Sequence, residues 1–135
     1  MIEFILLAKI FLVAFFINLL WEVLHSVLYE TCLRMKLQNY VPLIVKMSIK
    51  DGLWIVFFYI ITVLIFKNEI IIQNYLQLLI FSMLALSFSF IDERVSLKMR
   101  RWVYTKNMPI FFGVGLTPFL ELAITGLLTF FLVFN

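Results

Sequence analysis

A stripe of polar side chains in an apolar stretch near the N-terminus is the first place in this sequence where chemistry is expected. Asn18, Glu22, His25 and Tyr29 follow one another at steps of four, three and four residues, and Trp21 borders them. In a helix these steps place the four polar residues on one face. A carboxylate and an imidazole one turn apart are typical of an acid/base pair or of a structural hydrogen-bonded pair.

Three more acidic residues accompany later apolar stretches. Asp51 opens a second stretch, Glu93 closes a third, and Glu121 lies in a fourth, four residues after Thr117. Carboxylates held in apolar surroundings are often the acids and bases of enzymes. These residues are therefore the candidates for proton transfer.

The composition places these polar residues in a membrane protein. The chain has 135 residues, of which 64% are hydrophobic and 14% are charged, whereas a soluble domain has about 25% charged residues. A chain of this size leaves roughly a third of its surface exposed, so it cannot hide this much apolar area from water. The lipid bilayer is the expected partner, and the net charge of +3 is too small to indicate nucleic acid.

Four apolar stretches, residues 4–28, 47–66, 70–91 and 108–134, are long enough to cross a hydrocarbon core, which takes about 20 helical residues. Helices are expected because backbone groups in lipid must be satisfied within each segment. We therefore expect one all-α integral membrane domain, a four-transmembrane-helix bundle. Asn107 and Pro109 are expected to begin the fourth span, and Pro118 to kink it near mid-membrane.

Basic residues concentrate in the first and third connections, and the positive-inside rule predicts that these two connections are cytoplasmic. Both termini would then lie outside, in a multi-pass protein of the cell (inner) membrane. In the third connection Arg94, Lys98 and Arg101 recur on one helical face. This pattern favours a short interfacial basic helix that contacts lipid head groups, with a helical extension of the third span as the alternative.

This topology brings most of the polar residues into the cytoplasmic half, on inward faces. The expected catalytic residues are Glu22, His25, Glu121, Asp51 and Glu93. The expected substrate-binding residues are Asn18, Trp21, Tyr29, Trp54, Thr117 and Tyr104. The competing interpretation is structural: a hydrogen-bonded pair at Glu22 and His25, interfacial ion pairs at Asp51 and Glu93, and helix-to-helix hydrogen bonding at Glu121.

No cofactor and no metal are expected. Glu22-x-x-His25 has the spacing found in carboxylate-bridged di-metal bundles. Such sites need the motif twice, and the chain has one histidine, so a metal there would require a second copy of the chain. The single cysteine, Cys32, excludes an internal disulfide. The sequence also contains no phosphate-binding glycine loop and no nucleophile elbow.

The sequence favours a small membrane-embedded enzyme that transfers protons on an apolar, lipid-like substrate, such as an isoprenoid or a sterol-like molecule. An isomerase, a hydratase or a cyclase would act in a cavity open to the cytoplasm. One alternative is a non-enzymatic accessory or assembly subunit whose carboxylates pair with a membrane partner. The other is a proton- or ion-coupled transporter or channel formed by a homo-oligomer.

Overall fold

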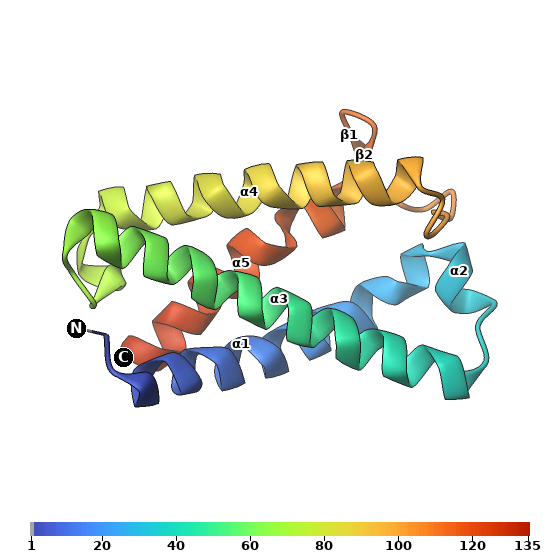
Figure 1. Cartoon of the computed structure of the whole chain (residues 1–135). Helices are drawn as coiled ribbons and strands as arrows, with labels where there is room; N and C mark the ends of the chain where they lie inside the picture. The colour runs from blue at the N-terminus through green and yellow to red at the C-terminus, as the bar shows by residue number, and fades with distance from the viewer. Residues whose placement is uncertain (1) are drawn as a thin grey trace.

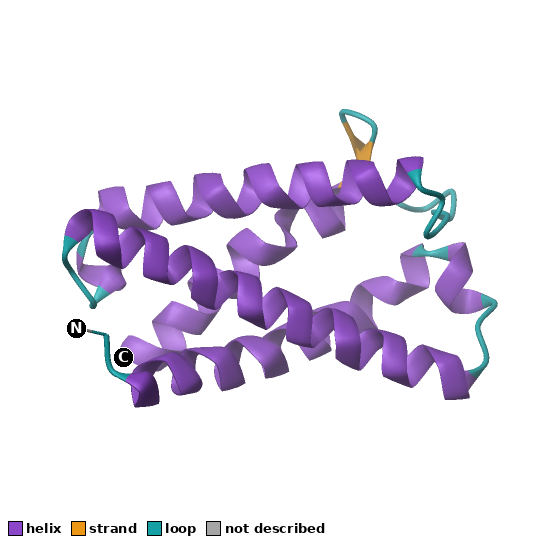
Figure 2. Ribbon diagram, in the orientation of Figure 1, coloured by secondary structure: helices purple, strands orange, loops and turns teal. Residues whose placement is uncertain are grey.

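The computed structural model describes residues 2–135, which form a bundle of long helices joined by short connections (Figure 1, Figure 2). The long helices are α1 (Phe4–His25), α3 (Leu37–Phe66), α4 (Tyr75–Lys98) and α5 (Leu116–Phe134). Within residues 2–135 these are the four helices long and apolar enough to cross a membrane. The expected all-α bundle with four candidate membrane spans is confirmed.

Short elements join the long helices. The 3₁₀ helix η1 (Ser26–Leu28) and α2 (Glu30–Leu33) connect α1 to α3, and η2 (Ile71–Gln73) precedes α4. A hairpin of β1 (Ile110–Phe111) and β2 (Val114–Gly115) precedes α5. Its turn residues Phe112 and Gly113 both have positive φ, 47° and 82°, as a two-residue turn between twisted strands requires.

The bundle has two different ends. Both termini and the α3–α4 connection lie at one end, whereas α2 lies at the other and the hairpin projects beside the C-terminal part of α4 (Figure 1). The half of the molecule next to α2 and the hairpin, formed by residues 22–51 and 88–122, contains every basic residue except Lys9 and Lys67. We call this half the basic end.

The third connection differs from the expected interfacial basic helix. Asn74 caps α4 by accepting hydrogen bonds from the backbone N–H groups of Leu76 and Gln77, and the helix continues to Lys98. Arg100 then adopts a left-handed φ of 56°. Within the described residues there is no helix between Lys98 and Leu116. Arg94 and Lys98 thus lie on an extension of the third span, which is the alternative that the same residue spacing allows.

The fourth long helix begins later than residue 108. Residues 110–115 form the hairpin, and the backbone N–H of Gly115 donates to the Tyr104 hydroxyl at 2.9 Å. Pro118 is consequently in the first turn of α5, where a backbone N–H has no helical partner in any case. The expected kink at mid-membrane does not arise. Glu121 lies in the second turn of α5 rather than at the middle of a longer span.

The apolar core lies mostly away from the basic end. The buried rings of Phe81 on α4 and Phe130 on α5 have centroids 4.7 Å apart. Gly126 lets the two helices approach, because a Cβ there would come within 2.4 Å of the Phe81 ring. Large apolar side chains remain exposed on the outward faces, for example Phe4, Phe16, Leu20 and Leu76. Such surfaces need lipid or a partner.

Candidate functional site

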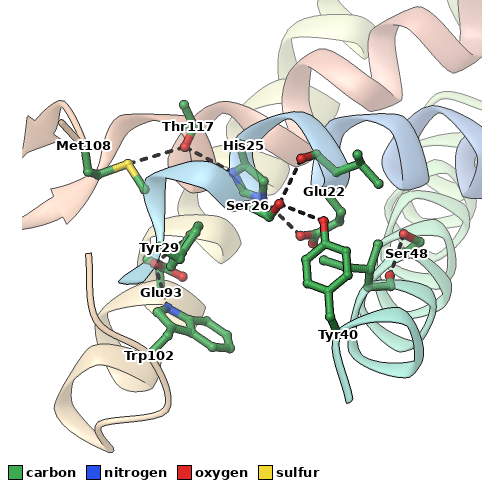
Figure 3. A network of polar contacts seen from close by, with 12 residues as sticks. Glu22, His25, Ser26, Tyr29, Tyr40, Ser48, Glu93, Trp102, Met108 and Thr117 are labelled. Carbon is green, nitrogen blue, oxygen red and sulfur yellow. Dashed lines mark hydrogen bonds and ion pairs between the residues drawn. The ribbon is translucent and has the colours of Figure 1, made fainter. Parts of the chain in front are cut away.

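His25, the last residue of α1, contacts both its own helix and α5 (Figure 3). Its Nε2 lies 3.0 Å from Glu22 Oε2, and its Nδ1 lies 3.1 Å from Thr117 Oγ1. The Thr117 hydroxyl also lies 3.5 Å from Met108 Sδ, to which it can donate; when it does so, its oxygen accepts from His25 Nδ1–H. The contacts with Thr117 and Glu22 together hold the ring with Nδ1 towards α5 and Nε2 towards Glu22.

Glu121 and Asp51 complete a buried acidic cluster around this pair. One ligand atom from each of Glu22, His25 and Glu121 lies within 4.8 Å of the other two. The carboxyl groups of Asp51 and Glu121 are both close enough to Glu22 to interact with it. All four residues are only 5–7% exposed. We call Glu22, His25, Asp51 and Glu121 the acidic centre; its members come from α1, α3 and α5.

Two carboxyl oxygens of the acidic centre are not used in hydrogen bonds among the described residues. Asp51 Oδ2 and Glu121 Oε1 are buried and have no hydrogen-bond partner among the described residues. Lys50 interacts with both carboxyl groups, but its ammonium donates its hydrogen bond to Asp92 Oδ2 at 2.7 Å. Buried polar atoms normally have partners, and those that lack one often belong to a binding or catalytic site.

A cavity of about 580 Å³ adjoins the acidic centre at the basic end. This volume lies within the range of roughly 300–1,000 Å³ that is typical of small-molecule sites. Lys50 and Asp92 are among its charged lining residues. Its apolar lining residues include Leu43, Ile44, Met47, Phe88, Pro118 and Leu122. The cavity therefore combines a polar centre with walls suited to an apolar molecule.

Glu93, near the end of α4, is held by three donors on a single oxygen. Tyr29, Trp102 and Tyr104 donate to Glu93 Oε1 at 3.2, 3.0 and 2.5 Å. Burial, and then the interaction with Glu93, raise the pKa of the Tyr29 and Tyr104 hydroxyls, so both phenols remain protonated donors. We call these four residues the Glu93 cluster. The cluster fastens α4 to both connections at the basic end.

The two connections at the basic end are also joined through their backbones. The N–H of Glu30 donates to the carbonyl of Val103 at 2.9 Å, and the N–H of Thr105 donates to the carbonyl of Leu28 at 2.8 Å. The segments on either side of Tyr29 and Tyr104 thus pair in an antiparallel bridge. One wall of the cavity is built by this paired layer, which contributes Tyr29, Arg101 and Trp102 to the lining.

The structure brings together all five residues expected to be catalytic. The cavity is lined by Glu22, His25, Asp51, Glu93 and Glu121, and also by Tyr29. Thr117 and Tyr104 do not line the cavity. Thr117 contacts His25, and Tyr104 contacts Glu93. These contacts fit positioning roles for both.

Three residues expected to bind substrate lie apart from the cavity lining. Asn18 is buried, and its Nδ2 donates to the Ala14 carbonyl at 2.8 Å. Trp54 packs against Phe88, with ring centroids 4.0 Å apart. Trp21 lies with its ring centroid 6.3 Å from that of His25, and its Nε1 has no partner among the described residues.

Ser89 and Trp102 contribute to the site but were not among the expected site residues. Ser89 lines the cavity, and its buried hydroxyl has no hydrogen-bond partner within residues 2–135. Its spacing of four residues from Glu93 places the two side chains on one helical face, which was a usable signal. Trp102 also lines the cavity and donates to Glu93. The sequence carried no comparable signal for Trp102, because its contact depends on how the chain turns after α4.

Comparison of the chain with protein-family models, with curated proteins and with solved structures found no match. The class of protein is therefore described from the fold and the site alone. The chain is a helical bundle with four candidate membrane spans and a buried acidic centre beside a cavity. The proposed function is inferred from the acidic centre and the cavity.

Proposed function

We propose that this protein is a small membrane-embedded enzyme that transfers protons on an apolar, lipid-like substrate, such as an isoprenoid or a sterol-like molecule. The observation that carries the proposal is the buried Glu22–His25 pair, with Glu121 beside it, at a cavity of about 580 Å³. An imidazole and a carboxylate 3.0 Å apart are placed to exchange a proton. The apolar lining favours an apolar substrate.

Each residue of the acidic centre has a proposed role. Glu22 and His25 form the acid/base pair, and Thr117 orients the imidazole. Glu121 and Asp51 act as a second acid or stabilise positive charge that develops on the substrate, because each keeps an oxygen without a partner among the described residues. Glu93 has a positioning role in this proposal, since three donors already occupy its Oε1.

These roles suit reactions that consist of proton additions and removals. An isomerisation adds a proton at one carbon of a double bond system and removes one from another. A hydration or a cyclisation also begins when an acid protonates the substrate. Two separate acid/base groups, the Glu22–His25 pair and Glu121, would serve the two halves of such a reaction.

The proposed orientation follows the distribution of basic residues. The basic end would face the cytoplasm in a cell (inner) membrane, with both termini outside. The cavity would then open towards the cytoplasmic leaflet, where an apolar substrate can enter from lipid. Arg94, Lys98 and Arg101 are exposed at this end and would contact anionic head groups.

Two other functions fit the geometry less well. In an accessory subunit, the unpartnered carboxylate oxygens would pair with basic residues of another protein, yet Asp51 and Glu121 line this chain's own cavity. A transporter needs a polar path across the bilayer. The lining residues of the cavity lie between positions 22 and 51 and between 88 and 122, in the basic end only.

The test compares the lipids of cells that express wild type, Glu22→Gln or Glu121→Gln. Leu53→Ala, at a position that is 57% exposed on the outer face of α3, is the matched control. We expect a lipid species formed by wild type and by the control to fall at least tenfold in both carboxylate variants, whose detergent-solubilised forms should stay monodisperse. Identical lipid profiles in all four strains would overturn the proposal. A loss of folding in both carboxylate variants would instead assign these residues to structure.

A further inference from the structure

We propose that Glu22, His25 and Glu121 bind a divalent metal cation, with the carboxyl group of Asp51 beside the site. The inference deepens the proposed function by adding a cofactor to the same site, and it rests on that site being functional. It goes against the sequence expectation, which set a metal aside because the Glu-x-x-His motif and the histidine each occur once. The fold places the carboxyl groups of Asp51 and Glu121, from α3 and α5, beside that single pair.

The first argument is the geometry of the ligand atoms. The His25 Nε2 and Glu22 Oε2 atoms are 3.0 Å apart, and a Glu121 oxygen lies within 4.8 Å of both. Adjacent ligands at about 2.1 Å from a metal in an octahedral shell are about 3.0 Å from each other. The three atoms can therefore surround one ion with only small side-chain movements. All three residues are buried, so little water competes for the ion.

The second argument comes from the unpartnered oxygens. Glu121 Oε1 and Asp51 Oδ2 are buried without hydrogen-bond partners among the described residues, and both residues line the cavity. Three carboxyl groups meet here, whereas the ammonium of Lys50 is hydrogen-bonded to Asp92. Burying carboxylates without compensation is costly. One divalent cation would offset two of the three negative charges and could accept the unpartnered oxygens as ligands.

The third argument is the orientation of the imidazole. A histidine that binds a metal usually donates its other ring N–H to a neighbouring acceptor, which fixes the ring and frees the ligating nitrogen. His25 Nδ1 lies 3.1 Å from Thr117 Oγ1, which can accept from it while donating to Met108 Sδ. Nε2 is left facing Glu22 and Glu121. This support comes from α5 and from the chain before it, not from the acidic cluster itself.

The donor set selects the kind of ion. One imidazole nitrogen with two or three carboxylate oxygens suits Zn²⁺ or Mn²⁺, whereas Mg²⁺ prefers oxygen ligands only and soft ions such as Cu⁺ prefer sulfur. An ion at this position would polarise an oxygen of the substrate as a Lewis acid. The residues around it keep the tasks of binding and orienting the apolar part of the substrate.

The experiment measures metal binding by the full chain in mild detergent. The protein is treated with a chelator, titrated separately with Zn²⁺, Mn²⁺ and Mg²⁺, and analysed for bound metal by mass spectrometry and for its midpoint of thermal unfolding. We expect about one Zn²⁺ or Mn²⁺ per chain and a higher unfolding midpoint with the ion. His25→Asn and Glu121→Gln should each weaken binding at least tenfold. Glu30→Gln, a control at a partly exposed carboxylate at the same end, should bind as wild type does.

Two results would overturn the metal site: no saturable binding of either ion, or equal binding by wild type, His25→Asn and Glu121→Gln. The proposed function is judged separately, by lipid turnover. If chelated wild type binds no metal and still forms the product that Glu22→Gln fails to form, the metal inference fails and the enzyme proposal stands. If the ion binds as expected while the lipid profiles of all strains are identical, the metal site stands and the enzyme proposal fails.

Discussion

His25, at the end of α1, is hydrogen-bonded through Nδ1 to Thr117 in the first turn of α5, at 3.1 Å. The two residues are 92 positions apart in the chain, so this contact joins the first long helix to the last. The Thr117 hydroxyl also contacts Met108 Sδ at 3.5 Å, so Thr117 links the imidazole to the segment that precedes α5. The contact therefore fixes the ring orientation on which both acid/base chemistry and metal binding depend.

Thr117→Val should impair the site without unfolding the protein. Valine has the shape of threonine but cannot form the hydrogen bond with His25 Nδ1, so the ring loses the contact that orients it. We expect lipid turnover to fall by roughly 10- to 100-fold, while Thr117→Ser, which keeps the hydroxyl, retains most of it. The measurement is the rate of product formation in cells or vesicles. Wild-type turnover by Thr117→Val would show that this contact does not orient His25.

Glu93→Ala should loosen the basic end. The substitution leaves three donors without their acceptor, the buried Tyr29 and the partly buried Trp102 and Tyr104. The cost is about 1–3 kcal/mol for each donor that stays buried and unpaired. We expect a lower unfolding midpoint and faster hydrogen exchange in residues 99–115, with the α4–α5 core unchanged.

Glu30→Ala is the control for the Glu93 substitution. Glu30 pairs with Arg34 at 3.3 Å in an exposed contact one helical turn apart, and such pairs contribute about 0.3–0.5 kcal/mol. The alanine variant should therefore unfold close to wild type. Equal effects of the two substitutions would argue against the Glu93 cluster as the fastening of the basic end.

The stability of the protein should fall at alkaline pH because of Tyr29 and Tyr104. Burial raises the pKa of both hydroxyls in the folded state, whereas the unfolded value is about 10. The folded state therefore holds these protons more tightly. The resulting stabilisation is complete below about pH 10 and is lost progressively as the pH rises above that value.

Removing either hydroxyl should make this alkaline loss smaller. Between about pH 9 and pH 11, the unfolding midpoint of Tyr29→Phe and of Tyr104→Phe should fall less steeply than that of wild type. Tyr75→Phe, at a residue that is 88% exposed, should follow wild type. Parallel curves for wild type and the two buried-site variants would contradict the assignment.

The proposed orientation predicts from which side Cys32 reacts. Cys32 is the single cysteine and lies at the basic end, so a membrane-impermeant maleimide should label it in inside-out vesicles and not in intact spheroplasts. Labelling should be slow at neutral pH, because burial raises the pKa of the thiol. Cys32→Ser combined with Asn135→Cys should reverse the pattern. Labelling of Cys32 from outside would place the basic end on the opposite side.

Periodicity and hydropathy were enough to predict part of this structure. The steps between Glu22 and His25 placed them on one face, and their side chains are hydrogen-bonded at 3.0 Å. The helical phase of the sequence also predicted that Glu121 faces inwards, and this residue is 7% exposed. Four long apolar helices followed from composition alone, because a lipid-facing helix needs no finer pattern than continuous apolarity.

The start of α5 and the pairing of the connections could not be predicted in the same way. Residues 110–115 are as apolar as a membrane helix, and the hairpin forms there because Phe112 and Gly113 turn the chain and Tyr104 binds the Gly115 N–H. The convergence of Trp102 and Tyr104 on Glu93 depends on long-range contacts. Periodicity within one element carries no information about such contacts.

In the proposed function, the cavity beside the acidic centre holds and converts an apolar molecule. The most direct measurement is mass spectrometry of the lipids that co-purify with wild type, with Glu22→Gln and with Met47→Trp. Met47 lines the cavity, so tryptophan there should fill it, and Leu53→Trp on the outer face of α3 is the matched control.

We predict that wild type and Leu53→Trp retain the same apolar molecule. Glu22→Gln should retain its unconverted precursor, which differs in mass or in chromatographic retention, and Met47→Trp should retain neither. The same set of bulk membrane lipids in all four preparations would contradict the proposed function, because no lipid would then depend on the cavity being unfilled.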